Sequence, residues 1–190
     1  MIEVLKDADR ALFLFLNGLN HPALDQLMYL MTGEVFWIPV FAWMLWMVYK
    51  AYGWKIALLS LLGVALTITL GDRISTELFK NFFLRYRPTH NADIGDLVYT
   101  VNDYRGGKYG FVSSHATNSA ALAVFIYGLV RQKFPRMSIG VFVWAAIFSY
   151  TRIYLGVHYP ADILCGALLG AGIGYLVYFG FRKVVLKNLK

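Results

Sequence analysis

Three clusters of ionisable residues interrupt an otherwise apolar chain, and they carry the side chains that phosphoryl transfer needs. The clusters are KNFFLRYRP at 80–88, GFVSSHATNSA at 110–120 and TRIYLGVHYPAD at 151–162. Their cations could bind phosphoryl oxygens, their imidazoles could attack phosphorus or carry a proton, and a carboxylate could orient the attacking imidazole. We therefore expect a phosphoryl-transfer site if the fold brings the three clusters together.

The first cluster carries two cations that a helix would place on one face. Lys80 and Arg87 are seven residues apart, which is two helical turns. Pro88 disfavours helix at Arg87, so we expect the helix to end near Leu84. The RYR segment then continues extended, with Arg85 and Arg87 on one side. A basic anchor at the membrane interface is the alternative interpretation.

The second cluster combines helix-capping serines with a histidine. Ser113 and Ser114 are favourable N-cap residues at the start of an apolar run. A helix N-terminus offers free backbone N–H groups and the positive end of the helix dipole, which together form an anion site. We expect the amides of residues 113–115 to face the anion and His115 to lie beside it. An ordinary cap followed by a histidine at the water boundary is the alternative.

The third cluster places a cation, an imidazole and a carboxylate at the junction of two apolar runs. Arg152 ends the first run, and Pro160 suits the first turn of the helix that follows. Asp162 lies one turn beyond His158 and could accept a hydrogen bond from its ring. That bond would fix the tautomer and raise the basicity of the opposite nitrogen. The alternative is a charged loop with a structural Arg–Asp pair.

The elements that must position these clusters are membrane helices. The chain has 190 residues, of which 58% are hydrophobic and 15% charged, and a soluble domain of this length could not bury so much apolar surface. We therefore predict an all-α polytopic membrane bundle with five to six transmembrane helices. It forms a single domain, 1–190, with an N-terminal interfacial segment at 1–23, containing a helix at 11–19, and an active-site-side helix and loop at 72–114. The five candidate spans are 24–49, 56–70, 116–130, 139–151 and 163–181.

Charge is distributed unevenly over the connections between these spans. If all five cross, the connections on one side and the C-terminal tail carry nine cations and no acid. The positive-inside rule predicts a cytoplasmic C-terminus, with the three clusters opening on the opposite face of a bacterial inner membrane, towards the periplasm or the outside. The net charge of +7 is then explained by anionic lipid headgroups rather than by nucleic acid. The nine cations are Lys50, Lys55, Arg131, Lys133, Arg136, Arg182, Lys183, Lys187 and Lys190.

The order and spacing of the clusters resemble the three-part signature of the type 2 phosphatidic acid phosphatase (PAP2) superfamily. The matching motifs are K-x6-RP, Ser-x-His and R-x5-H-x3-D, and they extend over residues 80–162. The arrangement of spans is similar to that of the integral-membrane lipid phosphatase branch. Two of the motifs depart from their usual form. The middle motif usually reads Pro-Ser-Gly-His and here reads Val112-Ser113-Ser114-His115, and the third usually begins Ser-Arg and here begins Thr151-Arg152.

The resemblance implies a metal-independent phosphatase that works through a phosphohistidine and needs no cofactor. His158 would be the nucleophile, Asp162 would orient it, and His115 would protonate the leaving group. Five residues would hold the phosphate: Lys80, Arg87, Ser113, Ser114 and Arg152.

A site at the outer interface predicts an amphiphilic partner, with its phosphate at headgroup level and its tail in the bilayer. Within the family that this chain resembles, we favour undecaprenyl diphosphate as the substrate. The alternatives are the 1- or 4'-phosphate of lipid A, phosphatidic acid and phosphatidylglycerol phosphate. We expect the segment 89–109 to act as a lid, in which Gly106 and Gly107 provide flexibility.

Three interpretations from other classes remain. A small transporter or proton relay would also use intramembrane His, Asp and Arg, although the sequence has no inverted repeat. A metal hydrolase built on His115, His158 and Asp162 would lose activity in chelator. The vanadium haloperoxidase branch of the same superfamily resembles soluble proteins, which this apolar chain does not.

Overall fold

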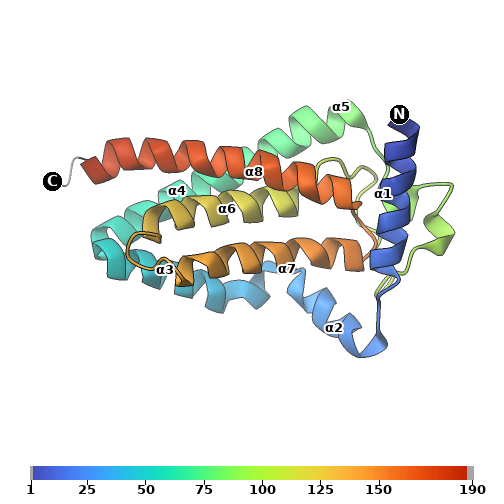
Figure 1. The fold of residues 1–190 in the computed structure, drawn as a ribbon, viewed down its shortest axis with the longest axis horizontal. Helices are drawn as coiled ribbons and strands as arrows, with labels where there is room; N and C mark the ends of the chain where they lie inside the picture. Colours follow the sequence, from blue (N-terminus) through green and yellow to red (C-terminus); the bar gives the residue numbers. More distant parts are fainter. Residues whose placement is uncertain (1, 188–190) are drawn as a thin grey trace.

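The protein is a bundle of apolar α-helices that is closed at one end by a crossing helix and loops (Figure 1). The computed structural model describes residues 2–187. In this range four helical segments are long and apolar enough to span a membrane: Glu34–Tyr52, Trp54–Phe83, Met137–Tyr154 and Pro160–Leu186. A further helix, α6, has 17 residues and packs against α4, α7 and α8. The predicted all-α membrane bundle is confirmed.

Short connections separate most of the helices, apart from one long segment between α5 and α6. The helical elements are α1 (Ile2–Asn17), α2 (Pro22–Met31), α3 (Ile38–Tyr52), α4 (Trp54–Arg73), α5 (Asn81–Phe83), α6 (Ser114–Val130), α7 (Gly140–Tyr154) and α8 (Pro160–Phe181), with 3₁₀ turns at Glu34–Trp37, Pro88–His90, Gly95–Leu97 and Met137–Ile139 and π-helical turns at Ile74–Lys80 and Arg182–Leu186.

The N-terminal helix lies across the end of the bundle. We expected a short interfacial helix at 11–19, and the structure has a longer one, α1, which runs crosswise to α7 and α8 in Figure 1. Asn17, at the end of α1, is 1% exposed. Its side-chain amide donates to the carbonyl oxygens of Ile153 and Tyr154, at 3.1 and 2.9 Å. These bonds fasten α1 to the end of α7, where the third cluster begins.

The first predicted span, 24–49, is wrong at its start. Helix α2 ends at Met31, and the backbone is extended at Gly33 (φ −86°, ψ 145°) before a 3₁₀ turn begins at Glu34. The chain breaks here because glycine has a low helix propensity, which the apolar residues on either side do not offset. Because the helix breaks here, Thr32 faces the third cluster. Its hydroxyl accepts a hydrogen bond from Arg152.

The second span continues well beyond its predicted end at residue 70. Helical structure runs without interruption over Trp54–Phe83. It ends at Leu84, which has a left-handed conformation with φ 47°, as the position of Pro88 predicted. Between Ile74 and Lys80 the helix is π-helical, a geometry that occurs frequently at functional sites. The first cluster therefore begins inside this long helix rather than on a separate helix that starts near residue 72.

Beyond that helix, two loop segments pair and fix the basic residues of the first cluster. The N–H of Arg87 donates to the carbonyl of Lys108 at 3.1 Å, and the N–H of Gly110 donates to the carbonyl of Arg85 at 2.9 Å. An isolated antiparallel bridge lies between these two bonds. The predicted extended RYR segment is confirmed, and the side chains of Arg85 and Arg87 both reach the third cluster.

A stripe of glycines lets α8 lie very close to α6. Gly166, Gly170 and Gly174 recur at every fourth position of α8. A Cβ atom at Gly170 would lie 2.0 Å from the carbonyl oxygen of Thr117 in α6. Small residues at this spacing allow helix backbones to approach each other within a membrane. The contact holds the N-terminus of α6, which carries the second cluster, beside the N-terminus of α8, which carries the end of the third.

We expect Gly170→Ala to destabilise the protein by about 1–3 kcal/mol, because the added methyl group overpacks the contact between α6 and α8. Gly172→Ala is the matched control, since a Cβ atom there has no neighbour within 4 Å. Removing a helical glycine without a clash should leave stability unchanged or raise it slightly. Thermal unfolding in detergent compares the two variants, and equal midpoints would contradict the packing role.

Candidate active site

The turn between α7 and α8 brings His158 back beside Arg152. Helix α7 ends at Tyr154, and Gly156 has φ 74°, a left-handed conformation that glycine adopts without strain. The N–H groups of Val157 and His158 both donate to the carbonyl of Arg152, at 3.0 and 3.3 Å. The five residues between Arg152 and His158 are thus the number that the chain needs to leave α7 and turn back to its last turn.

His158 and Asp162 form a buried, hydrogen-bonded pair. Their side chains are 1% and 0% exposed, and Nδ1 of His158 lies 3.3 Å from Oδ2 of Asp162. The same carboxylate oxygen accepts the N–H of Tyr159 at 3.0 Å. A carboxylate placed in this way favours the tautomer with a proton on Nδ1, which leaves the electron pair of Nε2 free. The predicted pair is confirmed.

The surroundings of His158 keep its imidazole neutral. Burial, followed by the charges of Arg87, Arg152 and Lys80, lowers the pKa of His158 well below its usual value of 6.5. A neutral imidazole with a free Nε2 can act as a nucleophile at pH 7. Burial and the charge of Arg152 also lower the pKa of Arg87 to about 10, so that its guanidinium is still charged at this pH.

Three cations converge around His158. Lys80, Arg87 and Arg152 are close enough for the charges of the two arginines to act on the lysine. Arg87 is only 9% exposed, and Arg152 is only 2% exposed. Like charges held together out of water repel each other strongly unless an anion lies between them. The arrangement is therefore that of an anion-binding site.

One N–H group of Arg152 is available to donate a hydrogen bond to that anion. Its Nη1 donates to the hydroxyl of Thr32, and its Nη2 donates to the hydroxyl of Tyr104 at 2.9 Å. Its Nε is buried and has no hydrogen-bond partner within residues 2–187. An unpaired buried donor costs about 1–3 kcal/mol. A phosphoryl oxygen that accepted from this atom would remove the cost.

The hydroxyl of Ser114 is held between two residues of the π-helical turn. Lys80 Nζ donates to it at 2.7 Å, and Ser75 Oγ lies 2.8 Å from it. Ser75 and Lys80 are five residues apart, a spacing that the i→i+5 bonds of a π-helix bring to one face. The wide turn therefore directs the Lys80 ammonium to the N-terminus of α6.

Ser113 caps α6, as predicted, but its amide is bonded within the protein and is not free to bind an anion. Its side-chain oxygen accepts the N–H of Ala116 at 3.4 Å. Its own N–H donates to the carbonyl of Asp162 at 3.1 Å. Our expectation for the amides of 113–115 is therefore wrong at Ser113, whose amide joins α6 to α8. Ser114 and His115 occupy the first turn of α6, at the positive end of its dipole.

His115 completes the cluster. Its ring packs against Phe148, with ring centroids 5.3 Å apart. The ring lies within electrostatic range of His158 and of the three cations. Within residues 2–187, no group of three His, Cys, Asp or Glu side chains is arranged to hold a metal ion. The structure thus brings together all eight predicted site residues: Lys80, Arg87, Ser113, Ser114, His115, Arg152, His158 and Asp162.

Besides Ser75 and Phe148, four side chains that contact this cluster directly or through one another were not predicted. Thr32 and Tyr104 bind the guanidinium of Arg152. Arg85 binds the carboxylate of Asp162, and Asp9 binds Arg85. The alternation of Arg85 with Arg87 in an extended segment was a usable signal for Arg85. The other three come from remote parts of the chain and had no local signal.

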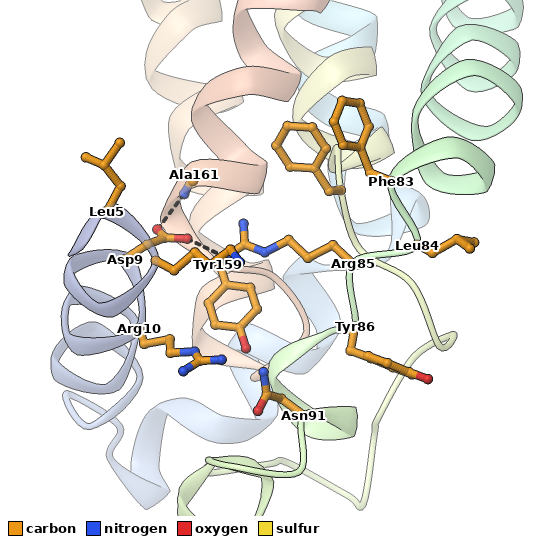
Figure 2. Close-up of a pocket in the computed structure, with 12 residues that line it drawn as sticks. Leu5, Asp9, Arg10, Phe83, Leu84, Arg85, Tyr86, Asn91, Tyr159 and Ala161 are labelled. Carbon is orange, nitrogen blue, oxygen red and sulfur yellow. Dashed lines mark hydrogen bonds and ion pairs between the residues drawn. The ribbon is translucent and has the colours of Figure 1, made fainter. Parts of the chain in front are cut away.

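A groove of about 690 Å³ borders the site on the side of Asp162, between α1 and the first cluster. Figure 2 shows Arg85 crossing this groove from the RYR segment towards Asp9 on α1, with the ring of Tyr159 beside it. Leu5, Phe83 and Leu84 form apolar parts of the wall. The groove is therefore lined mainly by apolar side chains, with Arg85 at its centre.

The chain matches the family model of the PAP2 superfamily over residues 53–185, which include all three clusters. The protein therefore belongs to the PAP2 superfamily. Its apolar spans and its family make it an integral-membrane lipid phosphatase.

Within this family, the chain is more similar to some phosphatases than to others. The chain is 43% identical to the lipid A 4'-phosphatase of Bacteroides thetaiotaomicron, with 98% of this chain and 83% of that protein covered. It is 40% identical to the lipid A 4'-phosphatase of Porphyromonas gingivalis, with coverages of 93% and 74%. Identity falls to 31% with an undecaprenyl-diphosphatase of Sulfolobus acidocaldarius, with coverages of 75% and 62%. Its fold is similar to that of a PAP2 phosphatidylglycerolphosphate phosphatase from Bacillus subtilis (TM-score 0.70, 22% identity, coverages of 95% and 88%).

Proposed function

We propose that this protein removes the 4'-phosphate of lipid A. The similarity to the Bacteroides lipid A 4'-phosphatase carries the proposal, because it extends along nearly the whole chain and includes all three clusters. The buried cations and the His158–Asp162 pair supply the chemistry that a phosphate monoester requires.

Undecaprenyl diphosphate, which the sequence led us to favour, is less well supported. The relative named for that reaction is more distant and matches a smaller part of both chains. Lipid A phosphate, which we had given as an alternative, is therefore the better choice of substrate. Both substrates offer a phosphate at headgroup level, so the site geometry is compatible with either.

In the first proposed step, Nε2 of His158 attacks phosphorus, and the bond between phosphorus and the sugar oxygen breaks. Burial, followed by the charges of Arg152 and the other groups around it, lowers the pKa of His115 to about 2, and the negative charge of a bound phosphate raises that pKa again. Protonated in this complex, His115 donates its proton to the departing oxygen, which leaves as a hydroxyl of the lipid. The products are a phosphohistidine at His158 and the dephosphorylated lipid. Lys80, Arg87 and Arg152 stabilise the charge on the phosphoryl oxygens throughout.

In the second step, a water molecule gives its proton to His115 and attacks phosphorus from the position that the sugar oxygen has vacated. The bond between phosphorus and Nε2 breaks, and its electron pair returns to the imidazole of His158. Inorganic phosphate leaves, and His115 is again protonated for the next cycle. The hydrogen bond to Asp162 stabilises the positive charge that the His158 ring carries in both transition states.

We infer that this site opens on the outer face of a bacterial inner membrane. Figure 1 places the α3–α4 and α6–α7 connections at one end of the bundle and α1 with the site loops at the other. The nine predicted cytoplasmic cations belong to the first end and to the C-terminal segment, which supports this orientation by the positive-inside rule. One of them, Lys190, lies outside the described residues.

Purified protein in detergent should remove the 4'-phosphate from lipid A that carries both the 1- and the 4'-phosphate. We expect a kcat/KM at least ~10²-fold above that for undecaprenyl diphosphate, since built sites commonly discriminate by this factor or more. Fragmentation mass spectrometry of the product identifies which phosphate was lost. Phosphatidylglycerol phosphate and phosphatidic acid serve as competing substrates.

The same assay should give undiminished activity in chelator. Three fixed cations already neutralise the phosphate, and they would repel a divalent metal ion from the same place. Loss of the 1-phosphate alone would overturn the proposed regiochemistry. Preferential hydrolysis of undecaprenyl diphosphate would restore our first choice of substrate.

A further inference from the structure

The carboxylate of Asp162 has a partner on each of its two oxygens. Oδ2 is shared by His158 and the backbone of Tyr159. Oδ1 accepts Nη1 of Arg85 at 2.8 Å. Asp162 is completely buried, and a buried carboxylate stays ionised only when a cation or several donors compensate its charge. Arg85 is the cation in direct contact with it.

Arg85 is itself held in place by α1. Its Nη2 donates to Oδ2 of Asp9 at 2.7 Å, and its guanidinium lies 4.1 Å from the ring centre of Tyr159. The other oxygen of Asp9 accepts the N–H of Ala161, in the first turn of α8, at 2.9 Å. Figure 2 shows Asp9 bridging Arg85 and Ala161 from the crossing helix. Asp162 in α8, the ring of Tyr159 just before α8 and Asp9 on α1 thus determine where the guanidinium lies.

We propose that Arg85, clamped by Asp9 of α1, is a positioning residue for catalysis: it holds Asp162 ionised and oriented, so that His158 presents Nε2 to the phosphate. The chain of contacts runs Asp9–Arg85–Asp162–His158. The proposal rests on the proposed roles of His158 and Asp162 and adds two residues that the three motifs do not specify.

Arg85 and Arg87 have separate tasks in this scheme. Arg87 donates to the carbonyl oxygens of Tyr109 and Val157 and acts electrostatically on Lys80, among the phosphate-binding cations. Both terminal nitrogens of Arg85 are instead occupied by carboxylates. A residue that acts through Asp162 should therefore affect kcat, whereas a residue that binds phosphate should also affect KM.

Arg85→Gln should lower kcat roughly 10²-fold and change KM by less than about 3-fold, as is typical when a partner that orients a catalytic group is lost. Arg85→Lys keeps the charge but can bridge the two carboxylates less well, so it should recover about a tenth or more of wild-type kcat. Asp9→Asn retains the acceptor for Ala161 and should lower kcat about 3–10-fold. Each variant is assayed with para-nitrophenyl phosphate as well as with lipid A. If the lipid A assignment is wrong, the effect of each variant on kcat can still be measured with para-nitrophenyl phosphate.

Arg10→Gln is the matched control, because Arg10 also lies on α1 beside the groove but pairs with Asp93 at 3.0 Å instead. Its kcat should equal that of the wild type. Thermal unfolding of every variant separates a fold defect from a catalytic one, and Arg85→Lys provides the comparison if Arg85→Gln is unstable. Wild-type kcat in Arg85→Gln, a rise in KM alone, or no recovery in a stable Arg85→Lys would each overturn the proposal.

Discussion

His158→Gln should abolish turnover, with kcat reduced roughly 10⁴-fold or more, and should form no covalent phosphoenzyme. Removal of a nucleophile eliminates the whole two-step path, and only the binding contribution of the cations is left. Glutamine is similar in size to histidine and can still donate to the carboxylate of Asp162, so the buried pair is not left unsatisfied. Rapid quenching with labelled substrate, followed by peptide mapping of the acid-labile phosphate, measures both effects.

His90→Gln is the control for this variant. His90 is the exposed last residue of the 3₁₀ turn Pro88–His90, and its Nδ1 lies 3.1 Å from the hydroxyl of Thr89. Its turnover should equal that of the wild type. Appreciable steady-state turnover by a well-folded His158→Gln protein would rule out the phosphohistidine at this position. So would label that maps to His115 in the wild type.

The parts of the site that the sequence predicted are those governed by local geometry. Asp162 follows His158 by one helical turn, and the Ser113 cap depends on neighbouring residues alone. Pro88 ended the preceding helix at Leu84 through its effect on adjacent backbone. Each of these rules acts over a few residues, so one sequence is enough to apply it.

The parts that it could not predict depend on contacts between distant segments. Arg85 and Asp9 are 76 residues apart, and Arg152 and Thr32 are 120 residues apart. Which acid meets which arginine is decided by how α1 and α2 pack across the end of the bundle. The same limit explains the error in the first predicted span. The average hydrophobicity of residues 24–49 is the same for one helix as for two, so it does not indicate the break that places Thr32 in the site.

His115→Asn should slow the release of the leaving group from the lipid much more than from para-nitrophenyl phosphate. For the lipid, whose sugar oxygen must be protonated as it leaves, we expect kcat to fall about 10²–10⁴-fold, the usual contribution of a general acid. For para-nitrophenyl phosphate the phenolate leaves without a proton, so the first step should proceed at close to its normal rate. The second step still needs a base to activate water, and phosphohistidine should therefore accumulate. Stopped-flow absorbance should show a burst of nitrophenol followed by a slow steady state.

The alternative is that His115 acts only through its packing against Phe148. A packing role predicts equal loss with both substrates and no burst, because nothing in it depends on the proton. His115→Phe would preserve that packing, so its activity on the lipid should be as low as that of His115→Asn if His115 is the acid. Comparing the two variants on two substrates thus distinguishes a role of His115 in proton transfer from a role in packing.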